Sequence, residues 1–458
     1  MPVVRPARRW AAVGLVVGLV GLGWAGPASA ADGTDGFWWY DATGVADVQA
    51  AGVTGAGVKV AVIDSAIDPQ VPMLVGANVT VNEPGFCHAD EGSGPLLPTT
   101  STQLTNSTWH GTNVTALISG TGKGDGGARS TAGIAPGATV TFYSIDDPAV
   151  DERTSVPCMT GSGQNLSLER AITTAVDSGA RIISLSDTGP SMNISRGTKA
   201  VFAWALHQGV VLVIALGDIP TDDDAMALMN GVVAVQAGDA NGAPMGTGTT
   251  AGVVPHARVT VLAPGVHMFM QGNPTTKSWQ DTPTGSGTSF ATPLVAGMLA
   301  DVASKYPKAT GNQLIQSLIH NTAKDDHALA YDPARGYGAA NLRHMLAVDP
   351  TQYPDVNPLI VQDAPAKWDN SAADIANATW PLEGIQPSPK PTGTARPSAT
   401  PGPSGASHPA TGAAGLPGWV WAVAAGTVLV LVLAVVLGLV LVRTTNRRRA
   451  GPPPGGQV

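Results

Sequence analysis

Cysteine is nearly absent from this sequence: its 458 residues include only Cys87 and Cys158. A cysteine-based metal site needs more ligands than these, so we expect no metal site, and we also expect no cofactor. If the chain is exported into oxidising surroundings, one disulfide between the two cysteines is the default expectation.

Positive charge is also scarce, since 25 Lys and Arg stand against 33 Asp and Glu and the formal net charge is −8. Seven arginines lie in residues 1–30 or after Trp419, where no acidic residue occurs, so the residues between them carry a formal charge of −15. An acidic segment of this kind argues against nucleic acid and anionic lipid as partners.

The N-terminal apolar run has the pattern of a signal peptide. Three arginines precede it, the run extends from Ala11 to Ala25, and the small residues Ala28-Ser29-Ala30 follow it. We therefore expect residues 1–30 to direct export and to be cleaved near Ala30. The alternative interpretation is an uncleaved anchor helix.

The C-terminal apolar run, Trp419 to Val442, contains 24 residues without a charge. About 20 suffice to cross a bilayer. Tryptophans at its start and four arginines behind it predict a transmembrane helix at residues 418–442 and a basic cytoplasmic tail at 443–458. The protein would then be a single-pass protein of the cell membrane with an extracytoplasmic domain. A buried core helix is the alternative, which the uniformly apolar composition disfavours.

Residues 31–346 have the pattern of an α/β domain. Short runs rich in Val, Ile and Leu alternate with helical stretches, which predicts a mostly parallel central sheet covered on both faces. The predicted strands are Val58–Ile63, Val140–Ile145, Arg181–Leu185, Val210–Leu216, Val232–Ala237 and Arg258–Leu262. The predicted helices are His110–Ser119, Ser167–Ser178, Ser195–Gln208, Thr288–Lys305 and Gly311–Asn321.

Two further segments separate this domain from the membrane helix. Residues 347–384 are a C-terminal extension of uncertain structure, which could form an arm lying on the domain. Residues 385–417 are rich in Pro, Ser, Thr, Gly and Ala, which predicts an extended, disordered linker.

Three segments carry residue types that suit nucleophilic catalysis. Val60–Ser65 is an apolar strand that delivers Asp64 at its C-terminal end. His110–Val114 places His110 at the start of a helix and follows it with a glycine. Gly285–Pro293 is a glycine-rich approach to Ser289, which opens a long apolar helix.

The chemistry of these three side chains is complementary. A serine hydroxyl needs an adjacent base, histidine is that base near neutral pH, and a carboxylate fixes the histidine tautomer. A helix N-terminus supplies backbone N–H groups where an oxyanion develops. We therefore predict that Asp64, His110 and Ser289 form a catalytic triad. One such residue alone in a Gly-rich turn is usually structural, but three in order within extended motifs favour catalysis.

The three motifs, in the chain order Asp, His, Ser, resemble the signature motifs of the subtilase family. Three shorter segments also resemble it: Gly133–Pro136, Ala263–Gly265 and Gly336–Gly338. The resemblance covers about residues 37–346. It implies a subtilisin-like three-layer fold, serine endopeptidase activity and a polypeptide substrate.

The arrangement of the whole chain resembles one subgroup, the mycosins, which are membrane-anchored subtilases of type VII secretion systems. The signal peptide, the short lead before Trp39-Tyr40, the linker and the membrane helix carry this resemblance. It implies cleavage of exported proteins in association with the secretion machinery. Mycosins usually have more than two cysteines, which counts against it.

The sequence departs from the family pattern at four places, of which three are small. Ala66 replaces a glycine, which is tolerable if its φ stays below zero. Thr115-Ala116 replaces Ala-Gly, a change in packing. Ser186, Asp187 and Thr188 are expected to bind the substrate, which would pair with them as a β-strand. Asp187 replaces an apolar residue there, which hints at a basic residue in the substrate.

The fourth departure concerns the oxyanion hole, where Asp218 occupies the position of the family's asparagine. Losing that donor costs about 10²–10³ in turnover in subtilisin. An ionised Asp218 would only accept hydrogen bonds and would repel negative charge. Asp222, Asp223 and Asp224 favour a protonated Asp218, which would donate and make activity rise as pH falls.

The alternative is that the domain is a catalytically weak or inactive scaffold of a secretion complex. An acyl-transfer enzyme with a non-peptide substrate is a third possibility, which no feature favours.

Overall fold

The computed structural model describes residues 35–90, 93–149, 166–186, 194–218, 226–246, 258–362, 370–380 and 393–395. All of them fall within the first of two units into which the chain divides, residues 1–399. The predicted signal peptide, membrane helix and cytoplasmic tail lie outside the described residues and stay predictions. Among the helices that are described, none is both long enough and apolar enough to span a bilayer.

The central sheet confirms the predicted mostly parallel α/β architecture. Its strands lie in the order β11-β10-β9-β8-β1-β7-β2-β14, and within it only β14 runs antiparallel to its neighbour. The bounds are β1 Lys59–Asp64, β2 Val79–Glu83, β7 Thr139–Ser144, β8 Ile182–Leu185, β9 Val211–Ala215, β10 Val233–Gly238, β11 Val261–Pro264 and β14 Gly393–Ala395.

Both faces of the sheet are buried. Along β1, Val60 and Val62 belong to one cluster of buried residues, whereas Ala61 and Ile63 belong to the other. Successive side chains of a strand point to opposite faces, so a strand that is covered on both sides is apolar throughout. This is why the near-continuous Val/Ile/Leu runs identified the strands.

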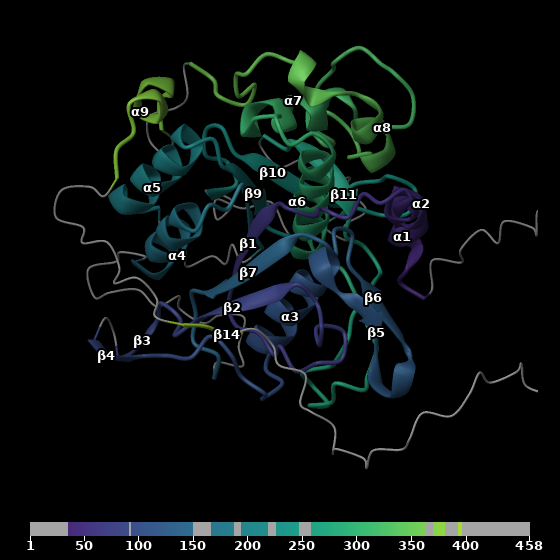
Figure 1. The fold of residues 1–458 in the computed structure, drawn as a ribbon, viewed down its shortest axis with the longest axis vertical. Coiled ribbons are helices and arrows are strands. Elements are labelled where there is room, and N and C mark those ends of the chain that lie inside the picture. The colour runs from purple at the N-terminus through teal and green to yellow at the C-terminus, as the bar shows by residue number, and fades with distance from the viewer. Residues whose placement is uncertain are drawn as a thin grey trace, which may run out of the picture. The chain divides into compact units, whose positions relative to one another are not determined.

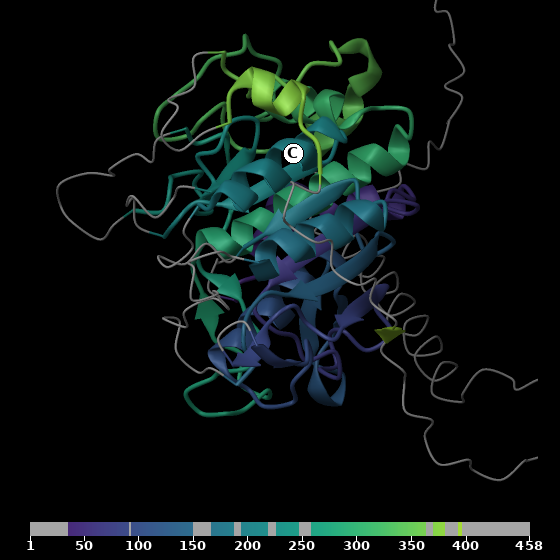
Figure 2. The same ribbon diagram turned by 90° about the vertical axis from the view of Figure 1, so that its left-hand side faces the viewer.

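Helices form the two outer layers. Helices α4 (Leu166–Asp177) and α5 (Arg196–His207) lie side by side against one face of the sheet (Figure 1). Helices α3 (Asn106–Ser119) and α6 (Thr288–Lys305) lie against the other face. Figure 2 views the molecule from the side of α4 and α5.

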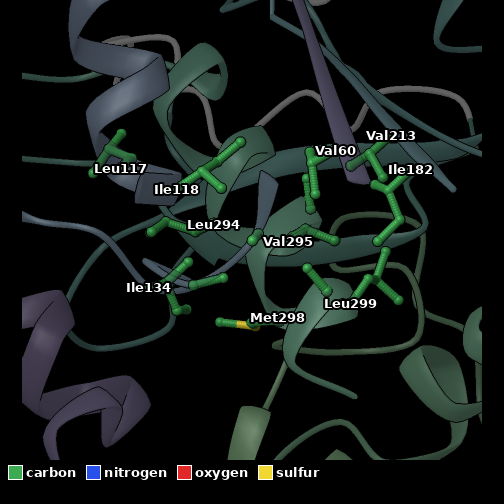
Figure 3. Packing of buried hydrophobic residues seen from close by; sticks show 14 of the residues in the cluster. Val60, Leu117, Ile118, Ile134, Ile182, Val213, Leu294, Val295, Met298 and Leu299 are labelled. Carbon is green, nitrogen blue, oxygen red and sulfur yellow. The ribbon is translucent and has the colours of Figure 1, made fainter. Parts of the chain in front are cut away.

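Helix α6 runs through the centre of its layer. Leu294 and Leu299 are fully buried, and in Figure 3 they lie among side chains from α3, the sheet and the segment that contains Ile134. At Gly297 a Cβ would overlap Cγ2 of Ile134, so only glycine lets the helix approach this closely. The core therefore holds the body of α6, whose N-terminus carries Ser289.

The remaining elements are short or peripheral. The helices are α1 Trp38–Thr43, α2 Val45–Ala50, α7 Gly311–His320, α8 Leu342–Ala347 and α9 Ala372–Ala376, with the 3-10 helices η1 Asp125–Gly127 and η3 Pro350–Gln352. The strands outside the central sheet are β3 His88–Asp90, β4 Ser93–Leu96, β5 Thr121–Lys123, β6 Arg129–Ala132, β12 Met268–Phe269 and β13 Thr284–Gly285.

The main differences from the prediction concern β11, β2 and the start of α3, which begins at Asn106 and not at His110. β11 starts at Val261, not at Arg258, because Arg258 has a φ of 60°, which a strand does not adopt. β2 was not predicted, because it mixes polar and apolar residues and lies near the edge of the sheet.

The segment after residue 347 lies along the domain. Asn230, just before β10, exchanges hydrogen bonds with the main chain of Val361, and Trp204 of α5 lies 6.3 Å from Trp380, centroid to centroid. Within the predicted linker, Gly393–Ala395 forms β14 beside β2. Without it, β2 would leave its outer hydrogen-bonding groups open.

Candidate active site

Asp64 is the last residue of β1, which lies near the middle of the sheet, between β7 and β8. Its side chain is fully buried, and Oδ1 accepts hydrogen bonds from the Ser65 N–H (2.9 Å) and the Ser65 hydroxyl (3.2 Å). Oδ2 is also buried and has no hydrogen-bond partner among the described residues. The carboxylate thus enters the site from the interior.

His110 lies on the second turn of α3, and its Nδ1 is 2.8 Å from Asp64 Oδ1. A capping box between Thr105 and Thr108 fixes the start of this helix. Because a carboxylate only accepts hydrogen bonds, we assign the proton to Nδ1, which leaves Nε2 as the basic nitrogen.

Gly111 explains how α3 approaches Asp64 so closely. A Cβ at this position would overlap the carbonyl oxygen of Ala66 and lie 2.9 Å from Phe142 Cζ. Ala66 has no positive φ, so replacing the family's glycine there causes no backbone strain. Thr115, the other small departure, is buried and donates its hydroxyl to Gly111 O at 2.7 Å. Both replacements fit the fold.

Ser289 is the second residue of α6 and is half-buried. The preceding Gly287 is held by its N–H, which donates to Gly265 O at 2.8 Å, and the Ser286 hydroxyl accepts from the His267 N–H at 2.9 Å. The first N–H groups of a helix have no intrahelical acceptor. The Thr288 N–H donates to Asp218 Oδ1 and the Phe290 N–H donates to Gly287 O at 3.1 Å, so the Ser289 N–H, which has no acceptor among the described residues, is the donor available beside the nucleophile. This arrangement suits a developing oxyanion.

The starts of α3 and α6 pack against each other through aromatic rings. The ring of Phe290 lies 5.9 Å from that of Trp109 and 6.1 Å from that of His110, between centroids. The structure thereby brings the predicted triad residues to one place. No hydrogen bond joins His110 to Ser289 among the described residues, and such bonds often tighten only when substrate binds.

Asp218 follows β9 and is exposed. Its Oδ1 accepts hydrogen bonds from the Thr288 N–H (2.9 Å) and the Thr288 hydroxyl (3.1 Å). A Cβ placed on Gly287 would lie 3.3 Å from Asp218 Oδ1, 3.5 Å from Oδ2 and 3.1 Å from Ser289 Oγ. The carboxylate therefore lies beside the predicted nucleophile and caps α6. Asp222, Asp223 and Asp224 lie outside the described residues.

The predicted substrate-binding residues are only partly described. Ser186 directly follows β8, so it lies at the C-terminal end of the parallel strands, as Asp64 does. Its buried Oγ has no hydrogen-bond partner within the described part of the chain. Asp187 and Thr188 lie outside that part. Their role in substrate binding stays a prediction.

Cys87 is buried and disulfide-bonded. Cys158 lies outside the described residues, so the predicted pairing itself stays a prediction. No cluster of three His, Cys, Asp or Glu side chains suited to a metal ion occurs in the described ranges.

Two features of the site's surroundings were not predicted. Thr288 holds Asp218 through both its N–H and its hydroxyl. Asp68, whose N–H donates to Thr112 Oγ1 at 2.9 Å, is buried, and burial raises the pKa of its carboxyl. The threonine that directly precedes Ser289 could have indicated the contact between Thr288 and Asp218. The second depends on packing that sequence does not reveal.

Known proteins are similar to this chain in sequence and in fold. The family model described as the subtilase family matches residues 55–338 of this chain. Fervidolysin from Fervidobacterium pennivorans is 31% identical over 326 residues, which are 67% of this chain and 43% of fervidolysin. Thermitase from Thermoactinomyces vulgaris is 29% identical over 59% of this chain and 82% of thermitase. The chain thus spans less than half of fervidolysin.

One solved structure shows the same likeness in fold. The crystal structure of fervidolysin, described as a keratinolytic enzyme related to subtilisin, has a TM-score of 0.51 and 26% identity over 70% of this chain and 47% of that chain. The crystal structure of MycP1 from Mycobacterium smegmatis has a TM-score of 0.48 and 21% identity over 72% of this chain and 89% of that chain.

Proposed function

This chain belongs to the subtilase family of serine peptidases, and from that membership we propose that it is a serine endopeptidase acting through Asp64, His110 and Ser289. The observation that carries the proposal is the 2.8 Å contact between His110 Nδ1 and the buried Asp64 Oδ1, beside the start of the Ser289 helix. This contact gives the histidine the tautomer that a general base requires.

In the acylation step, Ser289 Oγ attacks the carbonyl carbon of the scissile peptide bond while its proton passes to His110 Nε2. Asp64 stabilises the imidazolium that forms. When the tetrahedral intermediate collapses, the C–N bond breaks and His110 gives its proton to the leaving amine. The acyl group remains on Ser289.

In the deacylation step, His110 takes a proton from a water molecule, which attacks the ester carbonyl. Collapse of the second intermediate breaks the bond to Ser289 Oγ, and His110 returns the proton to that oxygen. The Ser289 N–H at the start of α6 stabilises the oxyanion in both steps. Asp218, in contrast, supplies no donor when ionised, so we expect attenuated turnover, or turnover favoured at acid pH.

We further propose that the enzyme is exported, anchored by residues 418–442 with its catalytic domain outside the cytoplasm, and cleaves exported proteins in association with type VII secretion. The support is the sequence pattern at both chain ends and the mycosin-like arrangement of segments. Deleting residues 418–458 should release the protein from the membrane fraction. If it stays membrane-bound without them, the proposed anchor is wrong.

Labelling with a diphenyl phosphonate, which reacts with activated serines, tests the enzymatic proposal. We expect the full-length protein in detergent to be labelled between weakly acid and neutral pH, and Ser289→Ala not to be labelled. Equal labelling of Ser289→Ala would place the reaction elsewhere.

A scaffold function is the second candidate, and the position of Asp218 favours it. A carboxylate held by Thr288 beside the nucleophile opposes the negative charge of the oxyanion. Under this function the wild type stays unlabelled at every pH, while Ser289→Ala still supports secretion in cells. Labelled wild type together with failed secretion by Ser289→Ala would exclude it.

A further inference from the structure

Asn113 lies three residues after His110 on α3 and is 1% exposed. Its Nδ2 donates to Trp109 O (2.8 Å) and Gln271 O (2.9 Å), and its Oδ1 accepts from the Gln271 N–H (2.9 Å). Because the Gln271 N–H requires an acceptor, the orientation of the amide is settled. One buried side chain thus binds both main-chain groups of a residue 158 positions away.

Gln271 belongs to the segment that leads to the nucleophile. On one side of it the Met270 N–H donates to Pro283 O at 2.9 Å, and on the other the Gly272 N–H donates to Asp281 O at 2.7 Å. The same two segments continue as the antiparallel strands β12 and β13, and β13 ends four residues before Ser289. A displacement of Gln271 would therefore reach the start of α6.

Gln271 is also held from its other side. Its side chain is 3% exposed; Oε1 accepts from the Ser130 hydroxyl of β6 at 3.0 Å, and Nε2 donates to Trp279 O. A third bond joins the same segment to α3, because Trp109 Nε1 donates to Gly272 O at 2.8 Å. The segment cannot shift toward or away from α3 without breaking several of these bonds.

We infer that Asn113 is a positioning residue, which sets the distance between His110 and Ser289 by fixing α3 against the β12–β13 hairpin. This inference rests on the proposed function. The hydrogen bond to Asp64 orients the imidazole but leaves open where Ser289 lies. The Asn113–Gln271 bonds supply that second constraint. A misplacement of about 1 Å at a reacting group can cost on the order of 10²-fold in rate.

Asn230 offers a matched control. It is also 1% exposed, its Nδ2 donates to Val361 O (2.9 Å) and Asn370 O (3.0 Å), and its Oδ1 accepts from the Val361 N–H (2.8 Å). It precedes β10 and so lies at the N-terminal end of the parallel strands, whereas Asp64 lies at their C-terminal end. Asn230→Leu therefore removes the same kind of bridge away from the site.

The experiment compares Asn113→Leu, Asn230→Leu and the wild type by the rate of diphenyl phosphonate labelling as a function of its concentration. We expect both variants to lower the melting temperature. We expect only Asn113→Leu to lower the maximal labelling rate, by about tenfold or more, with the half-saturating concentration little changed. This separation of rate from binding distinguishes positioning from a general loss of stability.

If the maximal rates of Asn113→Leu and Asn230→Leu are equal, well below both melting temperatures, the inference is wrong. If Asn113→Leu does not fold, Trp109→Phe decides, since it removes the bond to Gly272 O and keeps an aromatic ring beside Phe290. It should lower the maximal rate severalfold, and an unchanged rate would overturn the inference. A wild type that is not labelled would instead overturn the proposed function, and the inference with it.

Discussion

At the scale of single residues, the contact of Asp218 with α6 conflicts with its proposed place in the oxyanion hole. Its Oδ1 accepts the Thr288 N–H, which stabilises the start of α6, as a capping carboxylate does. A Cβ placed on Gly287 would lie within 3.5 Å of both Asp218 carboxylate oxygens and 3.1 Å from Ser289 Oγ. The carboxylate is therefore close to the predicted nucleophile. Stabilisation of the helix and of the oxyanion therefore make opposite demands on this residue.

Asp218→Asn should meet both demands. The amide oxygen can accept from Thr288 as Asp218 Oδ1 does, and the amide nitrogen then takes the place of Oδ2 and donates toward the oxyanion. We expect the labelling rate to rise by about 10²-fold, the lower end of the value for one such donor. The measurement is the rate at neutral pH, with Asp239→Asn, a loop carboxylate that follows β10, as the control.

The two variants are informative together. A rise in rate for Asp218→Asn alone would show that the hole limits the enzyme. No rise, despite an unchanged melting temperature, would mean that Asp218 does not face the oxyanion.

At the scale of elements, α6 depends on one glycine for its position. At Gly297 a Cβ would overlap Ile134 Cγ2 but would lie 3.5 Å from Ile134 Cβ, an ordinary contact. We therefore expect Gly297→Ala to cost about 1–3 kcal/mol of unfolding free energy through overpacking. Ile134→Ala alone should cost about 2–5 kcal/mol, because it leaves a cavity.

The double variant should cost less than the two single costs added together, because the new methyl group enters space that Ile134 vacates. Urea unfolding of the four proteins in a double-mutant cycle measures this coupling. Strictly additive costs would show that α6 does not approach Ile134 as closely as the structure indicates.

The predictability of the elements followed their environment. The bounds of α6, Thr288–Lys305, were predicted to the residue, because glycines precede it and a Tyr-Pro sequence follows it. The meeting of Asp64 with His110 was predicted from motifs, since a carboxylate at a strand end can orient a histidine, although α3 begins at Asn106 and not at His110. The Asn113–Gln271 bridge could not be predicted, because no local pattern indicates which distant main chain a buried amide will meet.

At the scale of the whole molecule, Asp301 makes stability depend on pH. It lies in α6 and is fully buried, and neither carboxyl oxygen has a hydrogen-bond partner among the described residues. Burial raises the pKa of this carboxyl from 3.8 to about 9. The folded protein therefore keeps the proton over a range of pH in which the unfolded chain has lost it.

The direction of the effect follows from that difference. Well below pH 4 both states hold the proton, so the group does not make stability depend on pH there. As pH rises toward 9 only the folded state holds it, so stability falls by about 1.4 kcal/mol per pH unit. At pH 7 the loss is roughly 4 kcal/mol, a large share of the 5–15 kcal/mol typical of a domain.

Asp301→Leu should remove this dependence. We expect its melting temperature to exceed that of the wild type at pH 7, and the difference to narrow steadily as pH falls toward 4.

Asp301→Asn is the control, because it keeps a buried polar group of similar size but does not titrate. The difference in melting temperature between Asp301→Asn and the wild type should narrow over the same range of pH. It should be smaller at each pH than the difference for Asp301→Leu, because burying the amide costs free energy. If the difference between Asp301→Leu and the wild type is constant with pH, Asp301 is ionised in the folded protein and has a partner. The proton that Asp301 holds in the folded state would make the protein more stable in weakly acid surroundings than at neutral pH.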